Sequence, residues 1–396
     1  MRLSLRSLLH HGIRNCVRIC IGSAALSLSG LSFAATAGNC TSWPAWEHFR
    51  QQFITKDGRV VDHSGSIKPT VSEGQAYAMF FAMAANDQTS FKLLLHWTGN
   101  NLAGGDLTVR LPAWQWGQRA DQSWGVIDHN SASDADVWMA YSLLLAGDIW
   151  GNASYSALGS LLAQRVLREE SLDLPGLGFS LLPAPHGFDL GEKRWKLNPS
   201  YVPLQLLRWL AIKEHDLRWQ QMAQASFRLL IQSAPKGFSP DWIIYQTTPS
   251  GRASFSPDLN GAEKGDGGYN AIRVYLWAGM LHAQDPERSR LLRHFAPMAA
   301  LTEQLGYPPE FVNIQTGEAK NPGSTGFSAA LLPFLSSGQH SKALQQQTLR
   351  IQANGIRPDA YYDQVLALFG LGWQEKRFAF LPDGRAEFAW QAAACH

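Results

Sequence analysis

The sequence predicts an all-α protein whose helices form hairpins arranged in a ring around one core. Apolar residues recur at helical spacing in about twelve segments of similar length, and Gly, Pro and Asn separate these segments. Strand patterns are short, and the clearest is a hairpin from Phe378 to Phe388 around a Pro-Asp-Gly turn. The 396 residues are 45% hydrophobic and contain no linker or low-complexity stretch, so the composition suits one large domain.

The expected helices follow one another along most of the chain. In the first, Trp46, Phe49 and Phe53 share one face. The ring would collect polar groups at one rim, where the second and fourth helices could bring their first turns together. The expected ranges are 43–54, 72–86, 88–100, 132–150, 153–169, 199–213, 216–233, 269–282, 286–305, 325–337, 340–352 and 359–371.

Residues 1–37 have the features of a secretory signal peptide, which leaves residues 38–396 as a single domain. Four arginines precede an apolar segment at 19–33, and Ala35-Thr36-Ala37 predicts cleavage after Ala37. An uncleaved anchor is the alternative, but the apolar segment is short for a membrane span. We therefore expect a secreted or periplasmic protein without stable membrane insertion.

Charge and cysteine content exclude several other classes. The signal segment carries four of the 34 basic residues and no acidic one, so 30 basic residues face 32 acidic ones in the remainder. That balance argues against a nucleic-acid partner. Cys40 and Cys395 could form one disulfide between the two ends of the exported chain, or remain two free thiols. Without a CxxC or HExxH motif, we expect neither a metal site nor a cofactor.

Two acidic residues at helix starts are the candidates for chemistry. Asp134 lies in Ala132-Ser133-Asp134-Ala135-Asp136, and Glu73 in Ser72-Glu73-Gly74-Gln75. In the simplest interpretation, Asp134 or its neighbour Ser133 caps a helix and Glu73 complements a helix dipole. A helix N-terminus lowers the pKa of a carboxyl group, so a general acid at Glu73 would need an aromatic wall or Asp134 to raise it again.

Two carboxyl groups that flank one bond are what glycoside hydrolysis requires. One protonates the leaving oxygen, and in an inverting enzyme the other activates water on the opposite face of the sugar. The sequence also contains 15 Trp residues, of which Trp114, Trp116 and Trp124 lie in the irregular segment 107–127. Flat aromatic rings beside a cleft can stack on sugar rings, which favours this interpretation.

The segment from Ala132 to Trp150 resembles the signature of the family 8 glycoside hydrolases, an Ala-Ser-Asp-Ala/Gly-Asp run followed by a helix. Ser72-Glu73-Gly74-Gln75, with Tyr77 after it, is similar to the other main motif of that family. Further similar segments are Leu111-Pro112-Ala113-Trp114, Asn198-Pro199-Ser200-Tyr201, Lys236-Gly237-Phe238-Ser239-Pro240-Asp241-Trp242, Gly306-Tyr307-Pro308-Pro309 and Gly326-Phe327-Ser328-Ala329-Ala330. The resemblance covers essentially the whole chain after the signal segment.

This resemblance implies an (α/α)6 barrel with an open cleft that cuts internal β-1,4-glucan bonds with inversion. By motif position, Glu73 would be the general acid. Asp134 would be the second essential carboxylate, which grips the distorted sugar. The positions implied to bind substrate are Trp114, Tyr201, Tyr269, Asn270 and Arg273.

One departure from the family pattern concerns the general base. Many members carry Tyr-Asp-Ala-Xaa-Arg where this chain has Tyr269-Asn270-Ala271-Ile272-Arg273. An asparagine can orient water but cannot accept its proton. Asp266 in the Gly-rich loop 265–268 is therefore the candidate base, unless it is only a turn residue. Glu263 and Asp241 are the other nearby carboxylates.

The expected function is an exported endo-β-1,4-glucanase. Within the family, the resemblance is to periplasmic endoglucanases encoded beside bacterial cellulose synthase, which implies a cellulose chain as substrate and the cellulose synthase export complex as a candidate partner. Chitosan, xylan or mixed-linkage glucan are alternative substrates. Asn270 also keeps open a catalytically impaired glycan-binding protein on the same fold.

Overall fold

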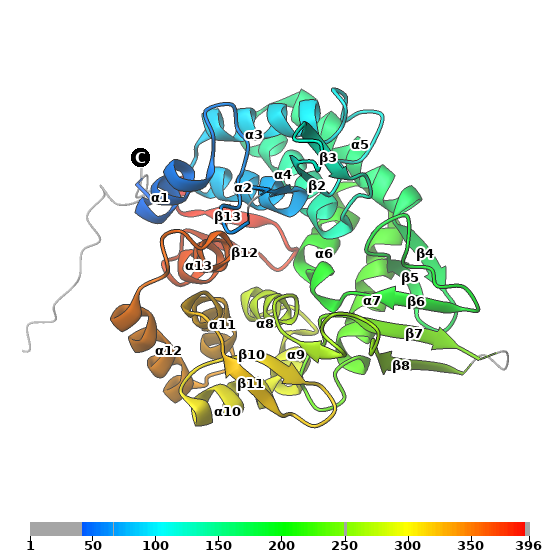
Figure 1. Ribbon diagram of the computed structural model, residues 1–396, viewed down its shortest axis with the longest axis vertical. Helices are drawn as coiled ribbons and strands as arrows, with labels where there is room; N and C mark the ends of the chain where they lie inside the picture. Colours follow the sequence, from blue (N-terminus) through cyan, green and yellow to red (C-terminus); the bar gives the residue numbers. More distant parts are fainter. Residues whose placement is uncertain (1–41, 66, 249–251, 393–396) are drawn as a thin grey trace, which may run out of the picture. The chain divides into compact units, whose positions relative to one another are not determined.

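Helices α2, α4, α6, α8, α11 and α13 form an inner ring, and the other helices pack against it from outside, in a computed structural model of the chain (Figure 1). The structure describes residues 42–65, 67–248 and 252–392, which belong to one compact unit. The inner helices are α2 (Ser72–Ala84), α4 (Ser133–Trp150), α6 (Leu204–Lys213), α8 (Ala271–Met280), α11 (Thr325–Ser337) and α13 (Tyr361–Gln374). The outer helices are α1 (Pro44–Phe53), α3 (Gln88–Asn101), α5 (Ala153–Glu169), α7 (Leu217–Gln232), α9 (Arg288–His294), α10 (Ala296–Leu305) and α12 (Ser341–Asn354). This is the (α/α)6 barrel that the sequence predicts.

The two rings differ in how much of each helix is apolar. Every residue of α8 is buried, and α4 is buried from Ser133 to Gly147. In outer helix α12, only Ala343 and Gln347 are buried. A helix that contacts protein on all sides needs apolar residues all round, whereas an outer helix needs only one apolar stripe.

Aromatic side chains fill the middle of the inner ring. The Trp277 ring lies 5.4 Å from Trp138 and 5.0 Å from Phe369, measured between centroids. Phe80 contacts Trp138 at 5.0 Å, and Tyr77 contacts Phe369 at 5.3 Å with nearly perpendicular rings. These rings from α2, α4, α8 and α13 close the barrel, so polar groups near its axis are restricted to its ends.

Short strands lie between the helices and fix the segments that lead into them. The strands are β1 (Thr70–Val71), β2 (Gln115–Gln118), β3 (Trp124–Asp128), β4 (Ser171–Leu174), β5 (Gly178–Leu181), β6 (Arg194–Leu197), β7 (Ile243–Thr247), β8 (Ala253–Pro257), β9 (Asp266–Gly267), β10 (Pro309–Asn313), β11 (Ala319–Pro322), β12 (Phe378–Phe380) and β13 (Ala386–Phe388). They form the antiparallel sheets β1-β2-β3, β4-β5, β6-β7-β8, β9-β10-β11 and β12-β13.

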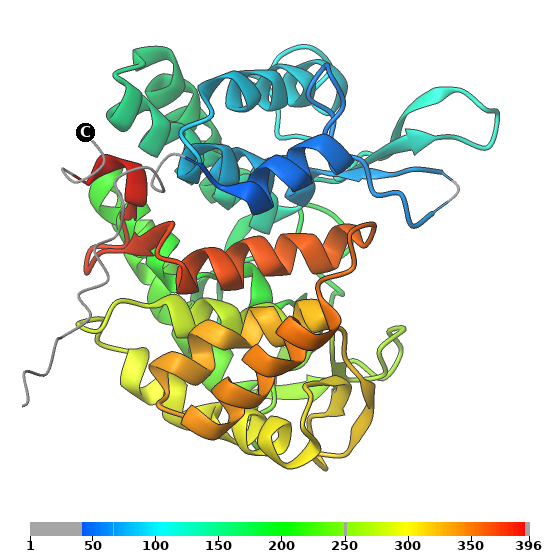
Figure 2. The same cartoon turned by 90° about the vertical axis from the view of Figure 1, so that its left-hand side faces the viewer.

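The first sheet determines where α2 begins. Val71 pairs with Gln115, and the Ser72 amide donates to the Trp114 carbonyl over 2.9 Å. Figure 2 shows the β2–β3 hairpin, in cyan, projecting from the end of the ring at which α13 also begins. Strand β1 therefore delivers Glu73 to the same end of the barrel as Trp114.

The expected helices are confirmed with two local corrections. The segment 286–305 is two helices rather than one, α9 and α10, because Pro297 has no amide hydrogen to continue the first helix. The segment 199–213 begins as a 3₁₀ turn, Pro199–Tyr201, and α6 starts only after Pro203. The hairpin expected at 378–388 is present as β12 and β13, and Phe380 pairs with Ala386 next to its turn.

The expected helix caps are wrong. The residue before α4 is Ala132, whose side chain cannot cap, and neither Ser133 nor Asp134 takes that position. The N-cap of α2 is Val71, and Gln75 accepts a bond from the Val60 amide. The carboxylate of Asp134 is therefore available for a role other than capping the helix.

Some predictions concern residues outside the described ranges. The signal segment, its cleavage after Ala37, and Cys40 and Cys395 with their disulfide all lie there. Within the described ranges, no helix has the length and hydropathy needed to span a bilayer.

Candidate active site

A cavity of about 300 Å³ opens at the end of the barrel where α2, α8 and α13 begin. A second cavity of about 610 Å³ adjoins it and shares four of its residues, so the two form one cleft. The lining of the first cavity is aromatic and polar: Asp62, Val71, Glu73, Tyr77, Trp114, Tyr269, Asn270, Arg273, Tyr361, Tyr362 and Val365. The shared residues are Asp62, Tyr269, Tyr361 and Tyr362.

Glu73 enters the cavity from the first turn of α2. Its Oε1 accepts a hydrogen bond from Trp114 Nε1 over 3.3 Å, and its Oε2 is buried without a partner among the described residues. Burial, followed by the nearby charge of Asp134, raises the pKa of Glu73 to about 8 despite its own backbone hydrogen bond and Arg273. Glu73 is therefore protonated at neutral pH, as a general acid must be.

Gly74 allows Tyr361 to approach the Glu73 turn closely. A Cβ atom at Gly74 would lie 2.5 Å from the Tyr361 hydroxyl oxygen. Tyr361 is itself packed against Phe49 and Phe53 of α1. The glycine therefore brings α13 against the first turn of α2, which closes one wall of the cavity.

Asp134 lies beside Glu73 but is almost completely buried, with 1% of its surface exposed. Its Oδ2 accepts bonds from Arg273 Nη1 over 3.0 Å and from the Tyr77 hydroxyl over 3.4 Å, and its Oδ1 accepts the Ala135 amide over 2.9 Å. Burial raises the pKa of Asp134, and Arg273 opposes that effect. All three of the donors to Asp134 favour its ionised form over the protonated one.

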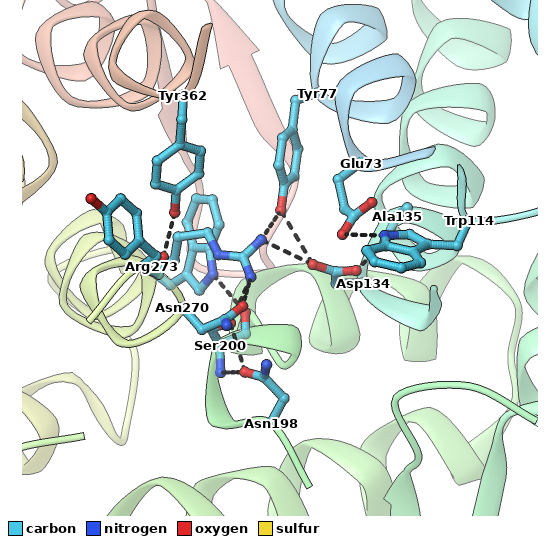
Figure 3. A network of polar contacts seen from close by, with 12 residues as sticks. Glu73, Tyr77, Trp114, Asp134, Ala135, Asn198, Ser200, Asn270, Arg273 and Tyr362 are labelled. Carbon is cyan, nitrogen blue, oxygen red and sulfur yellow. Dashed lines mark hydrogen bonds and ion pairs between the residues drawn. The ribbon is translucent and has the colours of Figure 1, made fainter. Parts of the chain in front are cut away.

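Arg273 lies between Asp134 and Asn270 and donates a hydrogen bond to each of them, as Figure 3 shows. Besides Asp134, its Nη1 contacts the Tyr77 hydroxyl at 2.8 Å. Its Nη2 donates to Ser200 Oγ over 3.0 Å and to Asn270 Oδ1 over 2.6 Å. One guanidinium thus fixes side chains from α2, α4, α8 and the 3₁₀ turn before α6 in a single arrangement.

The other residues expected to bind substrate lie around this network. Trp114, Tyr269, Asn270 and Arg273 line the cavity. Tyr201 does not line it; its ring lies behind Arg273, with the guanidinium carbon 5.7 Å from the ring centroid. Tyr201 therefore supports the arginine in this conformation rather than offering a free face to a sugar.

The three candidate bases differ in what already binds them. Asp241 is buried, and its Oδ1 accepts the amides of Gly268, Asn270 and Ala271 at the start of α8. Burial nevertheless raises the pKa of Asp241 to about 6. Its role here is to hold the first turn of α8 in place.

Asp266 and Glu263 lie in the loop before α8, and neither lines the cavity. Asp266 is held by Lys320 Nζ over 2.6 Å and by Asn313 Nδ2 over 3.0 Å, where β9 pairs with β10. The half-buried Glu263 carboxylate has no hydrogen bond or ion pair to any described residue. The contacts therefore leave Glu263, rather than Asp266, free to bind another group.

Sequence reasoning did not single out several residues of the cleft. Asp62 belongs to a loop with no recognisable pattern, and besides Glu73 it is the one carboxylate among the described residues that line the cavity. Tyr362 donates to the Tyr269 carbonyl over 2.5 Å and joins α13 to the start of α8. Tyr77 could have been found, because it lies in the motif that contains Glu73.

In the part of the chain that the structure describes, no group of three or more His, Cys, Asp and Glu side chains is placed to hold a metal ion.

Comparison with known proteins places this arrangement in context. The sequence profile of the family described as "Glycosyl hydrolases family 8" matches residues 20–376. An endoglucanase of Escherichia coli O157:H7 is 47% identical over 345 residues, which are 87% of this chain and 90% of that protein. An endoglucanase of Xanthomonas axonopodis pv. citri is 41% identical over 99% of both chains.

A solved structure has the same architecture. The crystal structure of an endo-1,4-D-glucanase from Vibrio fischeri ES114 superimposes with a TM-score of 0.81 at 45% identity. The match covers 89% of this chain and all of that chain.

Proposed function

This chain belongs to family 8 of the glycosyl hydrolases, and on that premise we propose that it is an endo-β-1,4-glucanase that cuts internal bonds of cellulose with inversion. One observation carries the proposal. The neutral carboxyl of Glu73 lies in an open, aromatic cleft beside the charged Asp134, which Arg273 fixes in place. A retained acid of this kind argues against a protein that only binds glycans.

Each carboxyl group has its own task. Glu73 protonates the oxygen of the leaving sugar, and Trp114 orients its carboxyl group. Asp134 is buried and does not line the cavity, so it acts through its charge, which stabilises the positive charge that develops on the ring of the sugar at the centre of the cleft. Arg273 cannot lose its proton in this pairing, so Asp134 stays ionised while the substrate is distorted.

A carboxylate in the loop before α8 acts as the general base, because Asn270 cannot accept a proton from the attacking water. Asn270 accepts a bond from Arg273 and orients the attacking water. Asp266, the residue that the sequence predicts, would first have to leave Lys320 and Asn313. Neither residue lines the cavity, so the loop before α8 has to move inward for either to act, and Glu263 then needs no exchange of partners. We therefore assign the proton to Glu263.

Substitution of both loop residues tests this assignment. Glu263→Gln should lower kcat about 10²- to 10⁴-fold, whereas Asp266→Asn should stay within about threefold of the wild type. Added azide should restore turnover of Glu263→Gln and give an α-glycosyl azide, because azide attacks without losing a proton. Unchanged kinetics of Glu263→Gln with a large loss in Asp266→Asn would return the role to Asp266.

Export and partnership belong to the same proposal. The N-terminal arginines and the apolar segment support cleavage after Ala37 and release into the periplasm or medium. There the enzyme would trim glucan chains beside the cellulose synthase export complex. N-terminal sequencing of the exported protein should begin at Gly38, and an intact N-terminus on the exported protein would refute the cleavage.

A substrate panel tests the activity itself. Residues 38–396 should lower the viscosity of carboxymethylcellulose well before reducing ends accumulate, which is the behaviour of an enzyme that cuts inside the chain. Chitosan, xylan and mixed-linkage glucan should be cut more slowly. Faster cleavage of any of these three would reassign the substrate. Tight binding of cellohexaose without cleavage would make the protein a glycan-binding one.

A further inference from the structure

The second aspartate of the Asp134 run faces away from the cleft. Asp136 follows Asp134 by two residues, which turns its side chain about 200° around α4. It points outward to Glu170, which directly follows the last residue of α5. Both Asp136 and Glu170 are fully buried, with 0% of their surface exposed. The mechanism proposed above uses neither residue.

These two carboxyl groups have almost no other polar partners. Ser131, in the loop before α4, donates its hydroxyl to Glu170 Oε1. Neither oxygen of Asp136 meets a donor or a cation among the described residues, and Glu170 Oε2 likewise has no hydrogen-bond partner among them. Two carboxylates in contact without a cation repel each other strongly when both are ionised. A proton on Asp136 would give these unpartnered oxygens a donor and remove one of the two charges.

The charges and the burial around Asp136 and Glu170 also favour their protonated forms. Burial and the neighbouring Glu170 raise the pKa of Asp136 well above its ordinary value, and burial raises the pKa of Glu170 to about 8. The ionisable groups that face the pair are Asp134 on α4, Glu73 on α2 and Glu169 on α5, and all three are acidic. A charge of this sign around the pair makes loss of its proton still harder.

We propose that Asp136 shares its proton with Glu170, and that this hydrogen-bonded pair positions the first turn of α4 so that Asp134 meets Arg273. In this pair the Asp136 hydroxyl donates to the Glu170 carboxyl group, which also accepts a hydrogen bond from Ser131. Inner helix α4 is thereby tied at its N-terminus to the end of outer helix α5. Asp136 and Glu170 are positioning residues, and their effect on turnover rests on the role proposed for Asp134.

The shared proton has a signature in stability that does not depend on activity. In the unfolded chain Asp136 ionises near pH 4, whereas in the folded protein it stays protonated up to a much higher pH. The folded wild type therefore loses stability relative to Asp136→Asn as the pH rises from 5 to 8, because the substituted asparagine side chain does not ionise in either state. The difference in Tm between the two proteins should grow steadily over that range.

Activity tests the positioning. Asp136→Asn keeps a donor for Glu170, so its kcat at pH 7 should stay within about threefold of the wild type. Asp136→Ala removes the partner of Glu170 on α4 and leaves only Ser131 bound to its carboxyl group among the described residues, so kcat should fall at least about 30-fold with little change in KM. The alkaline limb of its kcat/KM profile should also move to lower pH, because a displaced Asp134 no longer raises the pKa of Glu73.

Asp148 provides the matched control. It lies on the same helix, pairs with Lys213 at 2.6 Å, and is largely exposed to solvent. From pH 5 to 8, the Tm difference between Asp148→Asn and the wild type should vary much less than that of Asp136→Asn. A Tm difference for Asp136→Asn that is equally constant would overturn the shared proton. If Asp136→Ala does not fold, an at least 30-fold lower kcat of Asp136→Asn would overturn the positioning role.

These outcomes are distinct from failure of the proposed function. An inactive wild type would refute the glucanase assignment, while the pH-dependent Tm difference would still report the proton between Asp136 and Glu170.

Discussion

Glu73→Gln should abolish hydrolysis of cellohexaose, with kcat reduced about 10³-fold or more, while oligosaccharide binding stays within a few-fold of the wild type. Glutamine fits the space beside Trp114 but has no proton to give to the leaving oxygen. Substrates with a good leaving group, such as an aryl cellobioside, should retain much more activity. Stopped assays and calorimetry measure the two quantities.

The role of Glu73 as general acid also determines how the activity of the wild type depends on pH. Activity requires the protonated form of Glu73, so kcat/KM should fall as the pH rises through about 8. Glu47 provides the matched control, because it also lies in the first turn of a helix but is exposed on α1. Glu47→Gln should leave turnover unchanged. If Glu73→Gln retained wild-type turnover, the acid would be misassigned.

Asp134→Asn should lower kcat about 10²- to 10³-fold, because it removes the charge that faces the sugar ring at the transition state. Its second effect is on Glu73. The charge of Asp134 contributes to the raised pKa of Glu73, so its removal should move the alkaline limb of kcat/KM to lower pH. Arg273 would keep Tyr77, Ser200 and Asn270 as partners, so the site should stay folded.

Asp148→Asn, near the other end of α4, separates this effect from a general change in the helix. That control should show neither the loss of kcat nor the shift in the pH profile. A fully active Asp134→Asn would mean that the carboxylate only stabilises the start of α4.

Local sequence patterns were sufficient for the helices and for the centre of the site. Each helix carries its own apolar spacing, so the inner and outer rings could be predicted apart from the breaks at Pro203 and Pro297. The catalytic roles of Glu73 and Asp134 could be predicted because each lies in the first turn of a helix, within a motif of several characteristic residues. Their proximity follows from the ring, since both helices begin at the same end of the barrel.

Contacts between distant segments could not be predicted in the same way. Asp266 is paired with Lys320, which lies 54 residues further along the chain. No local sequence pattern predicts that ion pair. Tyr362 and Asp62 reach the cleft from the two ends of the chain. The partner of Asp136, Glu170, is likewise set by the packing of α4 against α5. The short strands also depend on such pairings, which is why only the final hairpin was expected.

The most direct test of the central claim is the anomeric form of the first products. Residues 38–396 are incubated with cellohexaose, and proton NMR follows the new reducing ends before mutarotation equilibrates them. The account predicts that the α-anomer appears first, because water attacks opposite to the bond that Glu73 protonates. Initial release of the β-anomer would contradict it, since a covalent intermediate and a different pair of carboxylates would then be required.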